Sequence, residues 1–242
     1  MLDQIKSVLE ENLRPHEKFI YGFADLKGLL PEDLAFFISG ISIGRRLDDA
    51  ILDKVTDGPT LAYYEHYRSI NEELAGISAK VCDELKKHDI NCEGIKPTMV
   101  IGGDEFKPYF ADLRYKVSHK MVATRAGLGW IGKTDLFVSK AFGTRLRLTS
   151  ILISKPFPIQ SVPVNKSRCG KCNICVERCP AHAATGKLWD IHTDRNEFFD
   201  PWKCRRMCAE MGLKYLKEDK LVCGVCVAVC PLGQDRKRQN HL

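Results

Sequence analysis

The feature that most constrains this chain is a run of cysteines at positions 169, 172, 175 and 179, with a proline directly after the last. The spacing C-x2-C-x2-C-x3-C-P wraps three thiolates around one cubane iron–sulfur cluster and directs the fourth toward a second cluster. Zinc is the alternative metal, because C-x2-C pairs also build zinc sites. Tetrahedral zinc, however, requires neither the third cysteine nor the C-P ending. The run therefore predicts iron–sulfur clusters.

A second, shorter motif near the C-terminus resembles the first. It begins C-G-x-C and ends C-P at Cys230-Pro231, but it has one cysteine fewer. We expect the missing ligand from Cys204, with Cys208 as the alternative, because the two lie just upstream in PWKCRRMC. They stand at i and i+4, on one face if this stretch is a helix, so either thiolate could reach. We predict two [4Fe-4S] clusters with crossed ligands. One set is Cys169, Cys172, Cys175 and Cys230, and the other is Cys179, Cys204, Cys223 and Cys226.

The usage of cysteine also bears on the cellular compartment. The chain has 11 cysteines, yet the N-terminus lacks a secretory apolar region, and the run Ala35–Gly44 is too short to span a membrane. These features predict a cytoplasmic protein without a membrane partner. Disulfides are rare there, so the cysteines indicate metal binding or redox chemistry. Cys82 and Cys92 have no neighbour at metal-ligand spacing and are predicted to be inert thiols.

The distribution of cysteines and prolines predicts two domains. Nine cysteines follow the Pro-rich stretch Lys155–Arg168, which reads as a connector. We therefore expect an α+β domain over residues 1–160, binding a corrinoid or substrate, and a ferredoxin-like domain with both clusters over residues 161–242. Periodicity predicts helices over 2–13 and 59–88. Apolar runs predict strands at 35–43, 98–101, 136–139 and 146–154, with the last two forming a hairpin around 140–143.

The segment AGLGWIGKT, residues 126–134, matches two phosphate-binding patterns, G-x-G-x-x-G and G-x4-G-K-[ST]. Both patterns need a strand before the glycines and a helix after them. Here the order is reversed, because Ser118 is expected to cap a helix that ends at Gly127 and a strand follows. The segment is thus predicted to be a helix-terminating turn. An open alternative is a cofactor site formed by Gly127, Gly129, Trp130, Gly132 and Lys133, with Trp130 packed on a large planar ring.

The stretch HKMVATRAGLGWIGKTDLFVSKAFGTRLRLTSILI, followed by the two cysteine motifs, resembles the epoxyqueuosine reductase family. The match extends from about Phe36 to the end, and this family in turn resembles the reductive dehalogenases. The resemblance implies a nitroreductase-like core that binds cobalamin, joined to a ferredoxin-like domain with two [4Fe-4S] clusters. In that family, electrons pass through the clusters to cobalamin, which reduces the epoxide of a modified guanosine in tRNA.

The chain departs from the family pattern at the expected proton donor. Members carry D-x-x-P-x-x-E-R before AGLGW, but here the Asp position is Leu113 and the Glu position is His119. The candidate catalytic residues are therefore His119, Asp112 and Tyr115, and His119 is preferred because imidazole titrates near neutral pH. Full-size members also continue into a helical-repeat domain that helps to hold tRNA, so another substrate is left open.

The charge of the chain is a weak guide to its partners. A net charge of +6 and a pI near 8.7 are below the range of dedicated nucleic-acid binders. The favoured function is an iron–sulfur oxidoreductase that reduces a corrinoid, with reduced ferredoxin or flavodoxin as electron donor and tRNA as one possible substrate. The alternative is a ferredoxin-like electron-transfer or reductive-activation protein that acts on a protein partner.

Overall fold

The computed structural model describes residues 2–98, 107–157, 159 and 161–234. It divides the chain into two compact units, and each unit gathers three separate stretches. The first unit comprises Met1–Arg45, Ile70–Leu128 and Arg147–Val164, and the second comprises Arg46–Ser69, Gly129–Leu146 and Asn165–Leu242. The predicted boundary between residues 160 and 161 stays a prediction, because a single cut of the chain does not separate these units. Among the described residues, none of the helices has the length and apolarity needed to cross a membrane.

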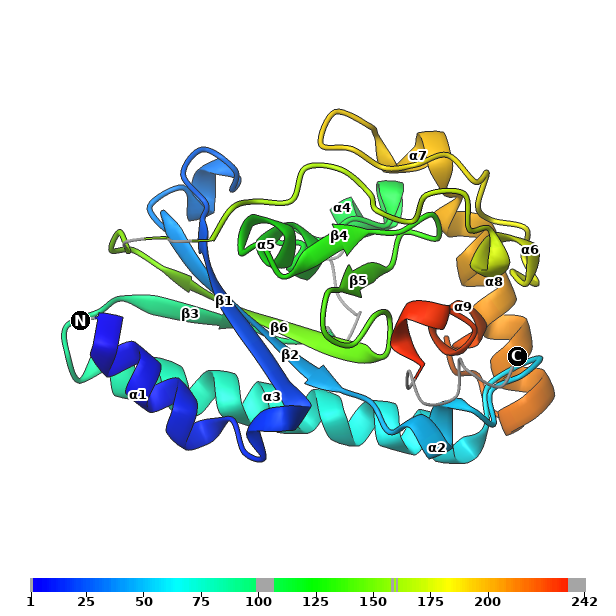
Figure 1. Ribbon diagram of the computed structural model, residues 1–242, viewed down its shortest axis with the longest axis horizontal. Coiled ribbons are helices and arrows are strands. Elements are labelled where there is room, and N and C mark those ends of the chain that lie inside the picture. The colour runs from blue at the N-terminus through cyan, green and yellow to red at the C-terminus, as the bar shows by residue number, and fades with distance from the viewer. Residues whose placement is uncertain (1, 99–106, 158, 160, 235–242) are drawn as a thin grey trace. The chain divides into compact units, whose positions relative to one another are not determined.

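The first unit is built on a four-stranded sheet in the order β1-β2-β6-β3 (Figure 1). Strand β1 (Phe19–Asp25) runs antiparallel to β2 (Ser39–Arg46), and β3 (Cys92–Ile95) runs antiparallel to β6 (Leu146–Ile153). The central strands β2 and β6 are buried over most of their length, as expected when both faces of a sheet are covered. This sheet and its helices make the chain a mixed α and β protein.

Helices cover the sheet of the first unit on its two sides. Helices α1 (Leu2–Asn12) and α3 (Leu61–Lys86) lie on one side, and α5 (His119–Arg125) lies on the other (Figure 1). The predicted helices over 2–13 and 59–88 are thus confirmed. The part of α3 in this unit buries a stripe spaced by fours and threes, which contributes about 1.5–3 kcal/mol for each fully buried side chain: Ile70, Leu74, Ile77, Val81 and Leu85.

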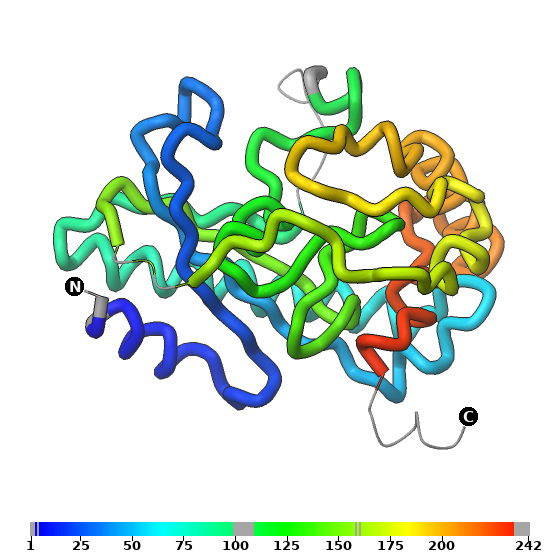
Figure 2. Tube along the Cα trace, turned by 45° about the horizontal axis from the view of Figure 1, so that its top comes forward, coloured from blue at the N-terminus to red at the C-terminus, as the bar shows by residue number. Residues whose placement is uncertain are grey.

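The second unit contains a two-stranded hairpin and short helices around the cysteine motifs. The hairpin joins β4 (Gly129–Ile131) to β5 (Phe137–Ser139). Helix α8 (Pro201–Met211) begins where the Asp200 carboxylate accepts the backbone N–H groups of Trp202 and Lys203. The first cysteine motif, in yellow, and the second, in red, come together where α6 (Ile174–Glu177) packs on α9 (Val225–Ala228) (Figure 2).

The remaining helices and helical turns are short. The α-helices are α2 (Asp49–Leu52), α4 (Lys107–Asp112) and α7 (Arg195–Phe198). The other turns are His16–Lys18, Glu32–Leu34, the π-helical turn Gly212–Leu216, and Pro231–Gly233.

Two strand predictions need correction. The strand predicted at 35–43 begins only at Ser39, after a helical turn at Glu32–Leu34. The hairpin predicted between 136–139 and 146–154 is wrong, because β5 pairs with β4 whereas β6 lies between β2 and β3. Gly129 has no Cβ, so the backbone of β5 approaches it closely at the Val138 carbonyl. Of the strand predicted at 98–101, Thr98 lies in a bend and residues 99–101 are outside the described residues.

Candidate metal centre

The first predicted ligand set is brought together in the second unit. Burial raises the pKa of the Cys175 thiol to about 11, and the charges of Cys230, Cys169 and Cys172 raise it as well, while a hydrogen bond from Thr134 lowers it. Burial also raises the pKa of Cys230, with smaller contributions from the charges of Cys169 and Cys172. Charge–charge effects of this kind fall with distance, so these four sulfur atoms lie near one another.

The second predicted set forms a group of its own. Burial raises the pKa of the Cys226 thiol well above its ordinary value, and the charges of Cys204, Cys223 and Cys179 add to this shift. Cys223 is likewise affected by Cys204 and Cys179. Cys175 of the first set also acts on Cys226, so the two groups are neighbours.

Cys204 and Cys208 lie on α8, one turn apart, as the spacing predicted. A hydrogen bond from the Cys208 thiol lowers the pKa of Cys204, which is therefore the member of the pair that more readily becomes a thiolate. Cys208 is also close to Cys223 and Cys226. Both cysteines thus border the second set, and the choice of Cys204 as the ligand stays a prediction.

The donor chemistry of these cysteines fits iron–sulfur clusters. Eight cysteines stand in two groups, and as thiolates the members of each group would repel one another. A bound cluster, whose iron is cationic, offsets this repulsion and the cost of burying thiolates. A cubane carries its four ligands on four different iron atoms. In the described ranges, no three His, Cys, Asp or Glu side chains converge as they would around a single ion.

The β4–β5 hairpin contacts the loop of the first cysteine motif. The indole N–H of Trp130 donates to Sγ of Cys169 at 3.4 Å, and Nζ of Lys133 donates to Oδ1 of Asn173 at 2.7 Å. A Cβ added to Gly132 would lie 3.6 Å from Sγ of Cys169. Three residues predicted to hold a planar cofactor therefore face the loop that carries the first cysteine motif. Their predicted contact with a corrinoid stays a prediction.

The glycine segment is not arranged as a phosphate-binding loop. The Ser118 hydroxyl accepts the backbone N–H of Met121 at the start of α5. The helix ends at Arg125, and Gly127 follows the C-cap residue Ala126 with a φ of +72°. A strand follows, so the predicted helix-terminating turn is confirmed. Gly127 belongs to the first unit, and a Cβ there would lie 2.8 Å from the Val162 carbonyl oxygen.

His119, the preferred candidate proton donor, makes a contact through each of its ring nitrogens. Its Nε2 lies 3.1 Å from the Lys96 carbonyl oxygen and therefore carries the proton, while its Nδ1 lies 2.9 Å from the Ser150 hydroxyl and accepts. Desolvation lowers the pKa of His119 to about 4. The contact with Lys96 raises this pKa, whereas the charge of Arg147 lowers it further. The ring is therefore neutral at neutral pH and occupied on both nitrogens. These contacts hold the ring at the start of α5, and its predicted catalytic role stays a prediction.

The other two candidate proton donors lie on and after α4. The Asp112 carboxylate pairs with the Arg114 guanidinium at 3.3 Å and accepts the Arg114 backbone N–H at 3.0 Å. Tyr115 is 41% exposed, and its ring stacks on Tyr109 with centroids 4.5 Å apart. Both side chains remain accessible to solvent, and their predicted catalytic role stays a prediction.

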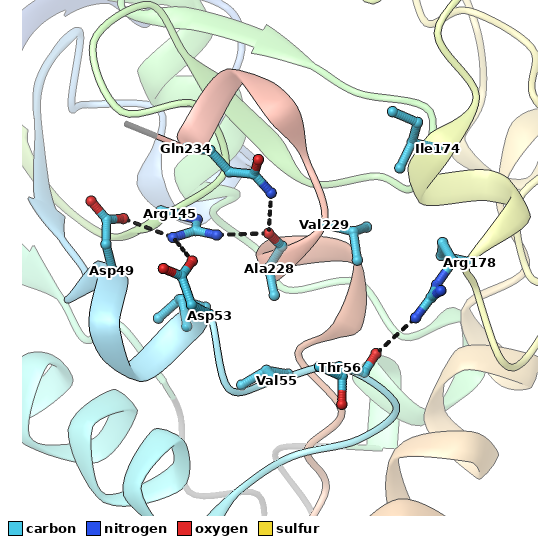
Figure 3. Close-up of a pocket in the computed structure, with 11 residues that line it drawn as sticks. Asp49, Asp53, Val55, Thr56, Arg145, Ile174, Arg178, Ala228, Val229 and Gln234 are labelled. Carbon is cyan, nitrogen blue, oxygen red and sulfur yellow. Dashed lines mark hydrogen bonds and ion pairs between the residues drawn. The ribbon is translucent and has the colours of Figure 1, made fainter. Parts of the chain in front are cut away.

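A cavity of about 480 Å³ lies in the second unit, beside α2 and α9 (Figure 3). The guanidinium of Arg145 is 1% exposed and forms ion pairs with Asp49 and Asp53, each at 2.9 Å. It also donates to the carbonyl of Ala228 at 2.9 Å, and Ala228 lies between Cys226 and Cys230 in the sequence. Arg145 therefore fastens the second cysteine motif to α2. The only sign of this role in the sequence is the spacing of Asp49 and Asp53, which are four residues apart and therefore lie on one face of a helix.

Cys82 and Cys92 lie in the first unit and are buried. The Cys92 thiol donates to the Cys82 carbonyl at 3.4 Å. This contact joins α3 to β3.

Residues 168–233 match the family model of a 4Fe-4S double cluster binding domain. The matched range contains both cysteine motifs and both cysteines of α8. The prediction of two [4Fe-4S] clusters is thereby confirmed at the level of the domain, without assignment of individual ligands.

Curated relatives are epoxyqueuosine reductases, as the resemblance predicted. The protein from Pseudomonas aeruginosa is 34% identical over 70 residues, which is 29% of this chain and 19% of that protein. The protein from Salmonella typhimurium is 32% identical over 128 residues, which is 52% of this chain and 29% of that protein. The chain therefore matches less than a third of the length of either relative.

Solved structures share the fold over nearly the whole chain. The epoxyqueuosine reductase of Bacillus subtilis has a TM-score of 0.56 at 17% identity, covering 98% of this chain and 67% of that one. A catabolic reductive dehalogenase has a TM-score of 0.64 at 13% identity, covering 89% of this chain and 30% of that one. The fold thus resembles those of epoxyqueuosine reductases and reductive dehalogenases.

Proposed function

We propose that this chain is a cytoplasmic iron–sulfur oxidoreductase whose two [4Fe-4S] clusters pass electrons to a corrinoid. The observation that carries the proposal is the gathering of eight cysteines into two groups within a segment that matches a double-cluster domain. The ligand sets are those predicted, with Cys204 completing the second. The chain's part is to supply the thiolates, of which Cys179 and Cys230 are buried, and to fasten the second motif through Arg145.

We extend the proposal to the fold and the substrate. The first unit would contain a nitroreductase-like core and residues 161–242 a ferredoxin-like domain. The substrate would be epoxyqueuosine in tRNA. Support comes from the relatives, all reductases, and from a solved epoxyqueuosine reductase in complex with a modified tRNA stem loop. The corrinoid is supported by the likeness to a reductive dehalogenase described as B12-dependent.

Iron content tests the clusters and cobalamin binding tests the corrinoid. Anaerobically reconstituted protein is expected to hold eight iron atoms per chain, four per cluster. Titration with hydroxocobalamin, and separately with flavin, is followed in the visible spectrum. Stoichiometric binding of hydroxocobalamin alone is the expected result. Eight irons without binding of either compound would refute the corrinoid and leave the clusters in place.

The substrate is tested in a single turnover. Protein loaded with cobalamin and reduced by dithionite is mixed with an anticodon stem-loop that contains epoxyqueuosine, and queuosine is measured by mass spectrometry. The expected product is queuosine. An unchanged stem-loop would exclude the tRNA substrate, and protein without cobalamin serves as the control.

A second function is favoured by the position of the β4–β5 hairpin. Trp130 and Lys133, expected to hold a planar cofactor, instead donate to the loop of the first cysteine motif. This arrangement suits an electron-transfer or reductive-activation protein that reduces a protein partner. Three results together would support this second function. The protein would hold eight irons, would not bind cobalamin, and would be reduced rapidly by ferredoxin or flavodoxin.

A further inference from the structure

The hydrogen bond from Trp130 to Cys169 joins the hairpin to the first ligand set. Trp130 is 7% exposed, and its indole N–H lies 3.4 Å from Sγ of Cys169. The indole has this one donor and no acceptor, so it serves the sulfur alone. Because the hairpin register pairs Trp130 with Val138, strand pairing holds the ring in place.

Two neighbouring side chains act in the same direction. Thr134, 5% exposed, lies within hydrogen-bonding reach of the Cys175 sulfur. Lys133, 4% exposed, places its ammonium group 2.7 Å from Oδ1 of Asn173, inside the loop between Cys172 and Cys175. The first ligand set thus receives an indole N–H, a hydroxyl and a nearby positive charge.

The second ligand set has different donors. Cys204 lies beside the Cys208 thiol, and Cys223 lies beside the backbone N–H of Val225. A thiol is a weak donor compared with an indole N–H or a hydroxyl. Reduction adds one electron to a cluster and increases the negative charge on its sulfur atoms. Donors and positive charge near the sulfurs stabilise the reduced state and raise the reduction potential.

We propose that Trp130 raises the reduction potential of the cluster held by Cys169, Cys172, Cys175 and Cys230, so that this cluster is reduced before the other. Trp130 acts through Cys169 and is a positioning residue. The proposal rests on the two clusters of the proposed function, but not on the corrinoid or the tRNA substrate. It also gives the GWIGKT segment a role in place of phosphate binding.

The test is an anaerobic redox titration of the full chain followed by electron paramagnetic resonance. Dithionite supplies the electrons, one to each cluster. Wild-type protein is expected to show two midpoint potentials. Trp130→Phe keeps an aromatic ring but removes the N–H, so the higher potential is expected to fall and the lower one to stay. We expect the equilibrium constant of reduction to decrease three- to tenfold, and tenfold is about 59 mV for one electron.

Trp189→Phe is the matched control. Trp189 is also buried, at 9% exposure, and it contacts the segment before Cys169 through its backbone, because its carbonyl accepts the Ser167 N–H at 2.7 Å. The control loses the same atoms and is expected to leave both potentials unchanged. Equal shifts in both variants, a shift of the lower potential, or no shift in Trp130→Phe would overturn the proposal.

A second variant covers the case in which Trp130→Phe does not assemble its clusters. Thr134→Val has nearly the same shape but lacks the hydroxyl, and it is expected to lower the same, higher potential. Loss of four irons in both variants, with eight retained in Trp189→Phe, would indicate a role in assembly and would overturn the proposal. Wild-type protein without iron would refute the proposed function itself, so the two failures are distinguishable.

Discussion

Cys230 lies close enough to Cys175 for its charge to raise the pKa of the Cys175 thiol, although the two residues belong to different cysteine motifs. Cys230 is correspondingly affected by Cys169 and Cys172 of the first motif. Each motif therefore contributes its last cysteine to the other motif's group. The crossed pattern of ligands stays a prediction, and the packing of α6 against α9 brings the two motifs close together.

The crossed pattern predicts how iron is lost when ligands are removed in pairs. Cys175→Ala and Cys230→Ala should each lower the iron content from eight to four, and the double variant should still hold four, because both residues serve one cluster. Cys226→Ala combined with Cys230→Ala should remove all eight. Iron analysis and the visible spectrum measure this. Four irons in the second double variant would mean that Cys226 and Cys230 share a cluster.

The choice between the two cysteines of α8 is tested in the same way. Cys204→Ala should lower the iron content to four, whereas Cys208→Ala should retain eight, because the Cys208 thiol donates to Cys204. Removal of that donor should change the potential of the cluster, not its assembly. The reverse pattern of iron contents would assign Cys208 as the ligand.

The contacts of His119 predict that acid destabilises the first unit. The pKa of this histidine is lowered from 6.5 to about 4, so the unfolded chain binds a proton before the folded chain does. Its contribution to stability is therefore complete above pH 6.5 and is lost as the pH falls toward 4. The loss is on the order of 3 kcal/mol.

The variant His119→Gln isolates this contribution. Gln keeps an N–H for the Lys96 carbonyl but does not titrate. Urea unfolding at pH 7 and pH 4.5 should show a smaller pH dependence in the variant than in the wild type. If turnover is established, the variant should also retain it at neutral pH. A loss of turnover without a loss of stability would restore His119 as a proton donor.

Arg145 and Arg178 allow the contribution of a buried ion pair to the free energy of unfolding to be compared with that of an exposed one. Arg145 is 1% exposed and bonds to Asp49, Asp53 and Ala228, so Arg145→Met should lower the free energy of unfolding by about 3–5 kcal/mol. Arg178 pairs with Asp57 at 3.4 Å through largely exposed side chains. Arg178→Met should cost at most about 1 kcal/mol. Thermal unfolding of the iron-loaded variants gives both values, and equal costs would contradict the assigned role of Arg145.

Local patterns in the sequence were sufficient for several features. The period of apolar residues predicted α3, and the position of Ser118 and Gly127 predicted the ends of α5. The cysteine spacing predicted a double-cluster domain, which the family model confirms over residues 168–233. These features depend on residues a few positions apart, whose geometry is set by one helical turn or one chelating loop.

The tertiary structure decided what no local pattern encodes. Trp130 and its sulfur acceptor are 39 positions apart, so the sequence alone did not indicate that the glycine segment meets the cysteine loop. The same holds for β5, which pairs with β4 instead of β6, and for His119, whose two ring nitrogens are occupied by Ser150 and Lys96. The sequence by itself determined the ligands' chemistry and spacing. Folding alone decided which donors surround them, because contacts between distant segments depend on how whole elements pack.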